Sequence, residues 1–256
     1  MINGSLKIAL IQDQPGSGIR DPYLEILRAK NPDIIAFPEY YFVNPEDKNI
    51  IVSSFIHDES LERLREWSAY LKCAIIGGTI VAESRGKLYN RSYFVNRGEI
   101  IGFYDKIHPY KNEGRGLIEK GSEYKVFDFT GLKIGILICA DVLYPASYSN
   151  IKGLKPHLIF VPTTSPYREN ESPHVKFARD DRLFVKGAET TGSLIFKVCA
   201  SGRIGARHFQ ARSLVATPRG IAWRNPPENE HKSALIYVNL ENPLKNPRLD
   251  IEVSRP

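Results

Sequence analysis

Cysteine is scarce in this sequence of 256 residues, and the three that occur lie far apart. Cys73, Cys139 and Cys199 form no C-x-x-C pair, which disfavours a disulfide scaffold and a structural zinc site and fits a reducing compartment. No apolar run approaches the roughly 20 residues of a membrane-spanning helix, and the first residues lack the small-residue cleavage site of a secretory signal. We therefore expect a cytoplasmic protein with no membrane partner.

Blocks of like charge are also absent. Lys and Arg number 35 against 29 Asp and Glu, a net charge of +6, but acidic and basic residues interleave, as over residues 62–66. The sequence contains no five-residue basic block and no Arg/aromatic motif of an RNA-reading sheet. A mildly basic, solvated surface explains this charge better than a nucleic-acid partner does, and we expect none.

Short apolar runs bounded by proline and glycine alternate with helical patterns, and no repeat or linker interrupts them. This order predicts one domain over residues 1–256, built as an α/β sandwich of two packed sheets with helices outside. Strands are predicted at 6–11, 33–37, 73–81, 133–138 and 157–161, helices at 23–30, 59–72, 145–153 and 174–190, and hairpins near Gly98 and Gly220. Asp58 or Ser60 is expected to cap the second helix. The tail 243–256 has no predicted core of its own and could lie at an oligomer interface.

Three polar residues stand at the ends of apolar segments, where sheet scaffolds commonly place functional groups. Cys139 directly follows a buried strand, which suggests a thiol displayed on a sharp turn. Glu39 follows another strand, and Lys106 follows the hairpin. Taken singly, each has a plainer explanation, because a buried cysteine is usually inert packing and most lysines are solvated.

Taken together, the segments around these residues resemble the nitrilase (carbon–nitrogen hydrolase) superfamily. They read Ala-Phe-Pro-Glu at 36–39, Tyr-Asp-Lys-Ile-His at 104–108 and Gly-Ile-Leu-Ile-Cys-Ala-Asp at 135–141. Further similarity extends over most of the chain, at residues 9–12, 90–92, 152–165, 187–189, 202–213 and 218–220. The resemblance implies a four-layer α-β-β-α sandwich, a Glu-Lys-Cys catalytic triad, no cofactor, and a homodimer or higher homo-oligomer.

The resemblance also implies a role for each residue of the triad. Glu39 would be general base and acid, Lys106 the electrostatic stabiliser and Cys139 the nucleophile. A second glutamate would hold the lysine or act on the substrate nitrogen; Glu113 is the candidate and Glu119 the alternative.

The chemistry of these side chains fits the same roles. A thiol becomes a strong nucleophile only as a thiolate, so Cys139 needs a base such as Glu39 nearby. Lys106 and the backbone N–H of Ala140 could stabilise the oxyanion that the attack creates. Ala140 replaces a residue that is commonly a large aromatic in the family, and Thr164 stands where asparagine is frequent. We expect Tyr110, Ala140 and Thr164 to line the substrate pocket.

The sequence therefore predicts a cofactor-independent thiol hydrolase acting on a small carboxamide. A nitrilase, an N-carbamoyl amino acid hydrolase and a catalytically silent binding module stay open as alternatives. A Cys–His protease is possible in principle because six histidines are present, but no local signature favours it. A metal hydrolase would need clustered ligands, whereas these histidines are scattered. Cys73 and Cys199 are expected to be core residues.

Overall fold

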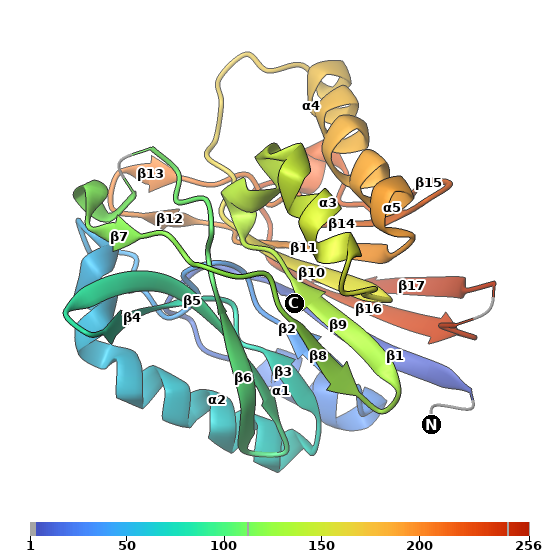
Figure 1. Ribbon diagram of the computed structural model, residues 1–256, viewed down its shortest axis with the longest axis horizontal. Helices are drawn as coiled ribbons and strands as arrows, with labels where there is room; N and C mark the ends of the chain where they lie inside the picture. The colour runs from blue at the N-terminus through green and yellow to red at the C-terminus, as the bar shows by residue number, and fades with distance from the viewer. Residues whose placement is uncertain (1–3, 112, 245, 256) are drawn as a thin grey trace.

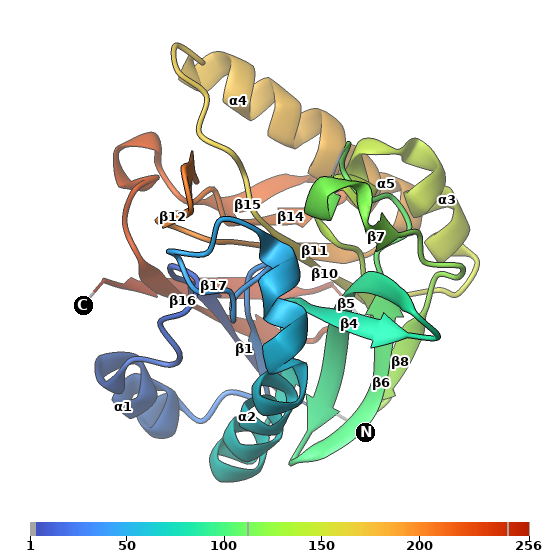
Figure 2. The same cartoon turned by 90° about the vertical axis from the view of Figure 1, so that its left-hand side faces the viewer.

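Four layers make up the protein, which is described from a computed structural model covering residues 4–111, 113–244 and 246–255. Two sheets face each other, as Figure 1 shows, with helices on both outer sides. Helices α1 (Asp21–Lys30) and α2 (His57–Leu71) cover one sheet. Helices α3 (Pro145–Lys152), α4 (Pro173–Asp180) and α5 (Lys186–Thr191) cover the other; Figure 2 shows the two helical layers on opposite sides of the molecule. The predicted α-β-β-α sandwich is confirmed.

The larger sheet has nine strands, in the order β17-β16-β1-β2-β3-β5-β4, with β6 and β7 also pairing with β5. Its central strands β1, β2 and β3 run parallel, whereas β4–β5, β5–β6 and β16–β17 pair antiparallel. The strands are β1 (Ser5–Gln12), β2 (Ile34–Ala36), β3 (Ala74–Ile76), β4 (Ile80–Ser84), β5 (Lys87–Asn96), β6 (Glu99–Asp105), β7 (Ile118–Glu119), β16 (Ala234–Glu241) and β17 (Arg248–Ser254).

The smaller sheet has six strands, in the order β15-β14-β11-β10-β9-β8. They are β8 (Val126–Phe129), β9 (Leu132–Ile136), β10 (Leu158–Thr163), β11 (Leu194–Cys199), β14 (Leu214–Thr217) and β15 (Gly220–Arg224). A separate hairpin joins β12 (Arg203–Ile204) to β13 (Arg207–His208). Because β9, β10 and β11 are parallel, their carboxyl ends share one edge. Segments that follow these strands are thereby brought together.

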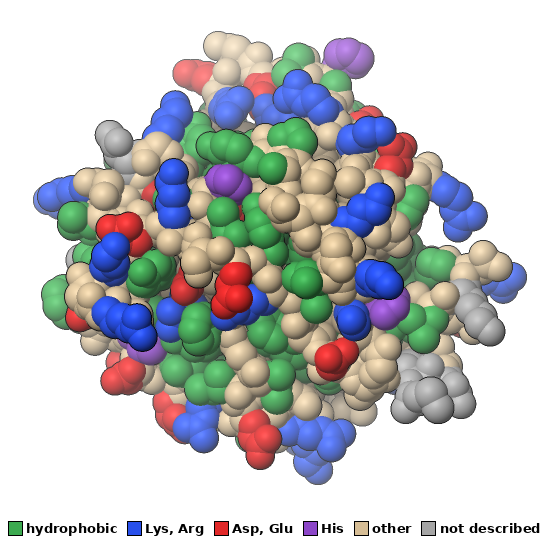
Figure 3. All heavy atoms as spheres, in the orientation of Figure 1, with side chains coloured by type: hydrophobic (Ala, Val, Ile, Leu, Met, Phe, Trp, Pro, Cys, Tyr) green, Lys and Arg blue, Asp and Glu red, His purple; other side chains and the backbone are tan. Residues whose placement is uncertain are grey.

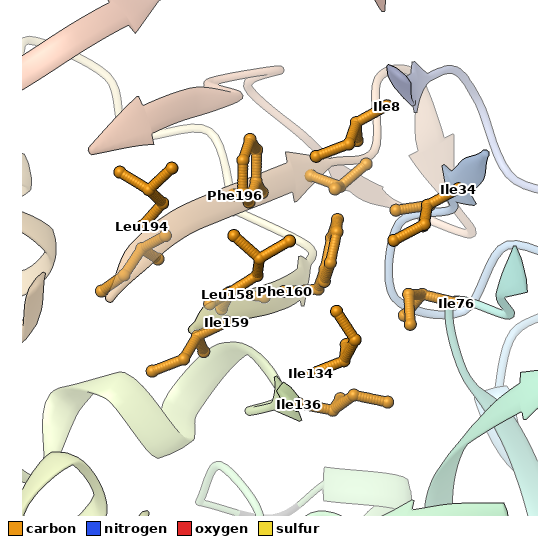
Figure 4. Close-up of a cluster of buried hydrophobic side chains, with 14 of the residues drawn as sticks. Ile8, Ile34, Ile76, Ile134, Ile136, Leu158, Ile159, Phe160, Leu194 and Phe196 are labelled. Carbon is orange, nitrogen blue, oxygen red and sulfur yellow. The ribbon is translucent and has the colours of Figure 1, made fainter. Parts of the chain in front are cut away.

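An apolar layer between the sheets holds the sandwich together. Figure 4 shows Ile8, Ile34 and Ile76 of the larger sheet facing Ile134 and Phe160 of the smaller one. All five are fully buried, and burial of each such side chain contributes about 1.5–3 kcal/mol. A second apolar cluster, containing Tyr23, Leu27, Leu64 and Leu71, attaches α1 and α2 to the larger sheet.

The predicted strand 73–81 is in fact two strands, β3 and β4, separated by a turn at Gly77 and Gly78. Gly78 has φ +61°, and a Cβ there would lie 2.2 Å from the carbonyl oxygen of Pro38. Only glycine fits so close to the backbone. Just beyond, the Thr79 hydroxyl accepts the N–H of Tyr40 at 2.9 Å. The break therefore lets the chain pack against the turn that carries Glu39.

One further prediction is confirmed with a refinement, and two others need correction. The helix 174–190 is helical throughout but contains a π-helical turn (Asp181–Val185) between α4 and α5. Neither Asp58 nor Ser60 caps α2, because the chain enters it directly from a 3₁₀ helix (Ile50–Ile56). The tail 243–256, of which residues 245 and 256 lie outside the described part, contributes strand β17 and packs Leu249, Ile251 and Val253 against the inter-sheet core.

The exterior is charged but mixed in sign. Lys and Arg side chains alternate with Asp and Glu on the face shown in Figure 3, as the sequence predicts. Among the described helices, none is both long and apolar enough to cross a membrane.

Candidate active site

Glu39 follows β2 of the larger sheet, and residues from both sheets hold its carboxylate. Oε1 accepts hydrogen bonds from Lys106 Nζ at 2.7 Å and from Asn90 Nδ2 at 3.0 Å. Oε2 accepts the backbone N–H of Thr164 at 3.0 Å and its hydroxyl at 2.6 Å. The side chain is only 1% exposed. These four bonds fix the carboxylate in a single orientation.

Lys106 comes directly after β6, and its ammonium lies between two buried carboxylates. Nζ donates to Glu39 Oε1 at 2.7 Å and to Glu113 Oε2 at 2.8 Å. Burial alone would lower the pKa of Lys106, but Glu39 and Glu113 together raise it above its ordinary value. Conversely, burial would raise the pKa of Glu113, and the Lys106 charge lowers it overall. The lysine is therefore a fixed cation in this site.

Glu113 is the glutamate that meets the lysine, and Glu119 is not. Besides Lys106, Glu113 accepts hydrogen bonds from the Tyr40 hydroxyl, from Asn90 Nδ2 at 2.7 Å and from the backbone N–H of Tyr110 at 2.6 Å. Glu119 is half exposed and lies 3.9 Å from the solvent-facing Lys87. Of the two predicted alternatives, only Glu113 belongs to this cluster.

Cys139 begins a 3₁₀ helix (Cys139–Leu143) just beyond β9 and has a left-handed backbone, with φ 43°. Such a conformation costs a non-glycine residue about 1–3 kcal/mol and is typical of functional turns. Its Sγ lies 3.5 Å from the carbonyl oxygen of Thr164. Burial and the Glu39 carboxylate raise the pKa of the Cys139 thiol well above its ordinary value, and Lys106 opposes them only in part. The resting thiol is therefore protonated.

Comparison with known proteins gives this cluster its context. The family model for carbon–nitrogen hydrolases matches residues 20–243. The chain belongs to the carbon–nitrogen hydrolase family.

Known proteins similar to this chain include several distant relatives. A glutamine-dependent NAD(+) synthetase of Acinetobacter baylyi is 23% identical over 66% of this chain and 33% of its own length, so the chain spans about a third of that relative. A nitrilase of Pyrococcus abyssi is 25% identical over 81% of this chain and 77% of its own. An amidase from Nesterenkonia sp. has the same fold, with a TM-score of 0.76 at 19% identity over 94% of this chain and 92% of that one.

The backbone N–H of Ala140 lies in the first turn of the 3₁₀ helix that follows β9. The first N–H groups of a helix have no intrahelical acceptor, and Ala140 is the second residue of the 3₁₀ helix that Cys139 begins. Its side chain is buried, with 2% exposure, so the methyl group contributes little surface to a pocket. The side chain of Tyr110 is 42% exposed, and its contact with the cluster is made by the backbone N–H.

Asn90 and Tyr40 are members of the cluster that the sequence did not predict as site residues. Asn90 is fully buried, and its Nδ2 faces Glu39, Glu113 and the Tyr40 hydroxyl, the last at 2.8 Å. Tyr40, like Cys139, has a left-handed backbone, with φ 57°. One signal for Asn90 was present in the sequence: it is a polar residue on the strand face that also carries Leu88 and Phe94.

The alternatives of a Cys–His pair and a metal centre find no support. The ring of His108 stacks on the ring of Tyr144, with 3.9 Å between their centroids, and its Nε2 lies 3.3 Å from the Tyr124 hydroxyl oxygen. Within residues 4–111, 113–244 and 246–255, no hydrogen bond joins Cys139 to a histidine. The same described residues contain no group of three or more His, Cys, Asp or Glu that could hold a metal ion. Cys73 and Cys199 are buried, as predicted for core residues.

Thr164 holds Glu39 in place, whereas the sequence suggested only that it lines a pocket. We expect Thr164→Val to lower kcat by about 10-fold, because it removes one hydrogen bond to the carboxylate while the backbone N–H keeps the other. Steady-state kinetics on a hydrolysed amide will measure this. Thr190→Val, which removes a hydroxyl bonded to the Lys186 carbonyl on α5, is the matched control. An equal effect of both substitutions would argue against a specific role for Thr164.

Proposed function

We propose that this protein is a cofactor-independent thiol hydrolase that cleaves the C–N bond of a small carboxamide. The observation that carries the proposal is the convergence of a carboxylate, a fixed ammonium and a thiol. Glu39 and Lys106 are hydrogen-bonded at 2.7 Å. Thr164 links Cys139 to them, because its N–H and hydroxyl bind Glu39 while its carbonyl oxygen lies 3.5 Å from the Cys139 sulfur. A nucleophile, a base and a cation together are what amide cleavage through a covalent intermediate needs.

The first half of the reaction forms a thioester. Because the thiol is protonated at rest, Glu39 accepts its proton as the sulfur attacks the amide carbon. Negative charge then develops on the carbonyl oxygen, where Lys106 and the Ala140 N–H stabilise it. As the tetrahedral intermediate collapses, the C–N bond breaks and the nitrogen takes the proton from Glu39. Ammonia or an amine leaves, and the acyl group stays on Cys139.

The second half regenerates the enzyme. Glu39 removes a proton from a water molecule, which attacks the thioester carbon. The C–S bond breaks, the acid is released and the sulfur regains its proton from Glu39. The sum of the two halves is amide plus water giving acid plus ammonia or amine. Glu113 contributes by helping to keep Lys106 charged and in place.

Fold neighbours named as amidases favour an amide over the alternatives. In one structure, a mutant of the Nesterenkonia sp. AN1 amidase carries the acetamide moiety of fluoroacetamide on its active-site cysteine. That chain shares 19% identity with this one, so for this protein the substrate class is our inference. A nitrile is the second candidate, favoured by the nitrilase relative of Pyrococcus abyssi.

Ammonia release from a panel of small amides, N-carbamoyl amino acids and nitriles tests this function. We expect turnover of at least one amide, with hydroxamate formed when hydroxylamine is present, because hydroxylamine intercepts a thioester. Intact-mass spectrometry followed by peptide mapping should place the acyl group on Cys139. Hydrolysis without hydroxamate and without an adduct would contradict the thioester route. No turnover of any class would favour a silent binding module.

A further inference from the structure

A buried carboxylate outside the Glu39–Lys106–Cys139 cluster joins the two segments that carry the lysine and the cysteine. Asp141 is fully buried and accepts three hydrogen bonds. Oδ2 accepts the backbone N–H of Ile138 at 2.8 Å and the Tyr104 hydroxyl at 2.8 Å, and Oδ1 accepts the backbone N–H of His108 at 2.8 Å. All three donors lie within two residues of Lys106 or Cys139 in the chain.

The positions of the three donors show what the carboxylate controls. Tyr104 lies two residues before Lys106 and His108 two residues after it, so Asp141 holds the lysine segment from both sides. Ile138 directly precedes Cys139. Asp141 also donates its own N–H to the Ile138 carbonyl at 2.9 Å, which closes the left-handed cysteine turn at both ends.

A second set of contacts joins the same segments. The His108 ring stacks on Tyr144 at 3.9 Å, and the Tyr124 hydroxyl contacts His108 Nε2 at 3.3 Å and donates to Ser147 Oγ at 3.1 Å. Tyr144 and Ser147 follow the cysteine turn. The lysine segment is thus attached to the cysteine segment at several points, and among these points Asp141 is the only carboxylate in the described residues.

We propose that Asp141 is a positioning residue, which sets the placement of the Lys106 ammonium relative to the Cys139 sulfur. This inference rests on the proposed function. An ionised carboxylate only accepts hydrogen bonds, and here it meets three donors. An amide in its place would turn its NH₂ toward at least one of them. Displacement of a catalytic group by about 1 Å can cost roughly 100-fold in rate.

Asp141→Asn tests the proposal through a split between kcat and KM. We expect kcat on a hydrolysed amide to fall about 100-fold. KM should stay within about threefold of the parent value, because Asp141 is proposed to position catalytic groups and not to bind the substrate. Asp128→Asn makes the same chemical change at an exposed position of β8 and should leave both constants unchanged. A kcat within about twofold of the parent would overturn the proposal.

Hydrogen–deuterium exchange supplies a readout that does not depend on activity. In Asp141→Asn, amide exchange should accelerate in peptides covering 104–110 and 137–141, while β16 and α2 keep their parent rates. Unchanged exchange at both segments, or faster exchange throughout a variant that circular dichroism shows to be folded, would overturn a local positioning role. If no substrate is turned over by the parent protein, the proposed function fails, and this exchange pattern still decides whether Asp141 fixes the two segments.

If Asp141→Asn does not fold, Tyr104→Phe is the variant that tests the proposal. It removes only the hydroxyl, leaving both backbone donors on the carboxylate. We expect a smaller loss of kcat, about fivefold, with faster exchange confined to 104–110 and 137–141. Parent-like kcat and exchange in this variant would overturn the proposal.

Discussion

Replacement of Cys139 by alanine will abolish amide turnover, lowering kcat by about 10⁴-fold or more. The thiol is the group in the cluster best suited to form the covalent bond to the substrate carbon, because sulfur is a stronger nucleophile than the neighbouring hydroxyl and carboxylate oxygens. Cys73 and Cys199 are buried. The fold should survive, because the Sγ makes one weak contact, to the Thr164 carbonyl. Alanine also tolerates φ 43° no worse than cysteine does.

Three measurements keep this prediction specific. Circular dichroism and thermal unfolding should show that Cys139→Ala is folded, so that lost activity is chemical. Cys139→Ser should be almost as inactive, because a hydroxyl in this site is far less acidic than a thiol. Cys73→Ala, which alters a buried thiol in the layer between α1, α2 and the larger sheet, should keep parent kcat. Residual amidase activity in folded Cys139→Ala would rule the residue out as the nucleophile.

The sequence could predict the residues at strand ends because two local features coincide there. An apolar run that stops just before Glu39 or Cys139 marks the carboxyl end of a buried strand. In a parallel sheet, the carboxyl ends of neighbouring strands lie side by side. The ordered resemblance to carbon–nitrogen hydrolases then indicates which polar residues to expect in the site. That information lies within a few residues of each position and needs no knowledge of packing.

The partners of those residues could not be predicted in the same way. Thr164 lies 125 positions from the carboxylate that it holds, and Asn90 lies 51 positions from it. Their contacts depend on how the two sheets pack and on the register of β5, which local patterns do not encode. The same reason explains the errors at Gly78 and β17, where contacts with distant chain, at Pro38 and β16, decide the local structure.

Replacement of Lys106 by methionine should be nearly as damaging as loss of the thiol, but with a different signature. We expect kcat to fall at least about 1000-fold, since removal of one oxyanion-stabilising group typically costs 100- to 1000-fold. The substitution also leaves Glu39 and Glu113 buried and facing each other without a cation. Mutual repulsion then favours protonation of one carboxyl group, which removes the base in part of the population. Breaking a buried ion pair from one side typically costs about 3–5 kcal/mol of stability.

The pH dependence of stability separates this electrostatic role from simple packing. In the parent protein the Lys106 pKa is raised above its ordinary 10.5 and the Glu113 pKa is lowered below its ordinary 4.5. The free energy that this ion pair contributes to folding is therefore fully present between pH 4.5 and pH 10.5, and it is lost only at lower or higher pH. In Lys106→Met a carboxyl pKa is instead raised in the folded state, so the folded state binds more protons. Its Tm, relative to the parent, should then rise as the pH falls from about 7.5 to 5.5.

Lys87→Met is the matched control, because it removes a lysine charge from a half-exposed position of the same sheet. Surface ion pairs contribute about 0–1 kcal/mol, so Lys87→Met should keep both the parent kcat and the parent pH profile of Tm. A Lys106→Met protein with near-normal turnover would exclude the oxyanion role. If Lys106→Met loses activity but its Tm shows no relative rise at lower pH, the ammonium does not control the protonation of Glu39 and Glu113. The lysine would then act on the substrate alone.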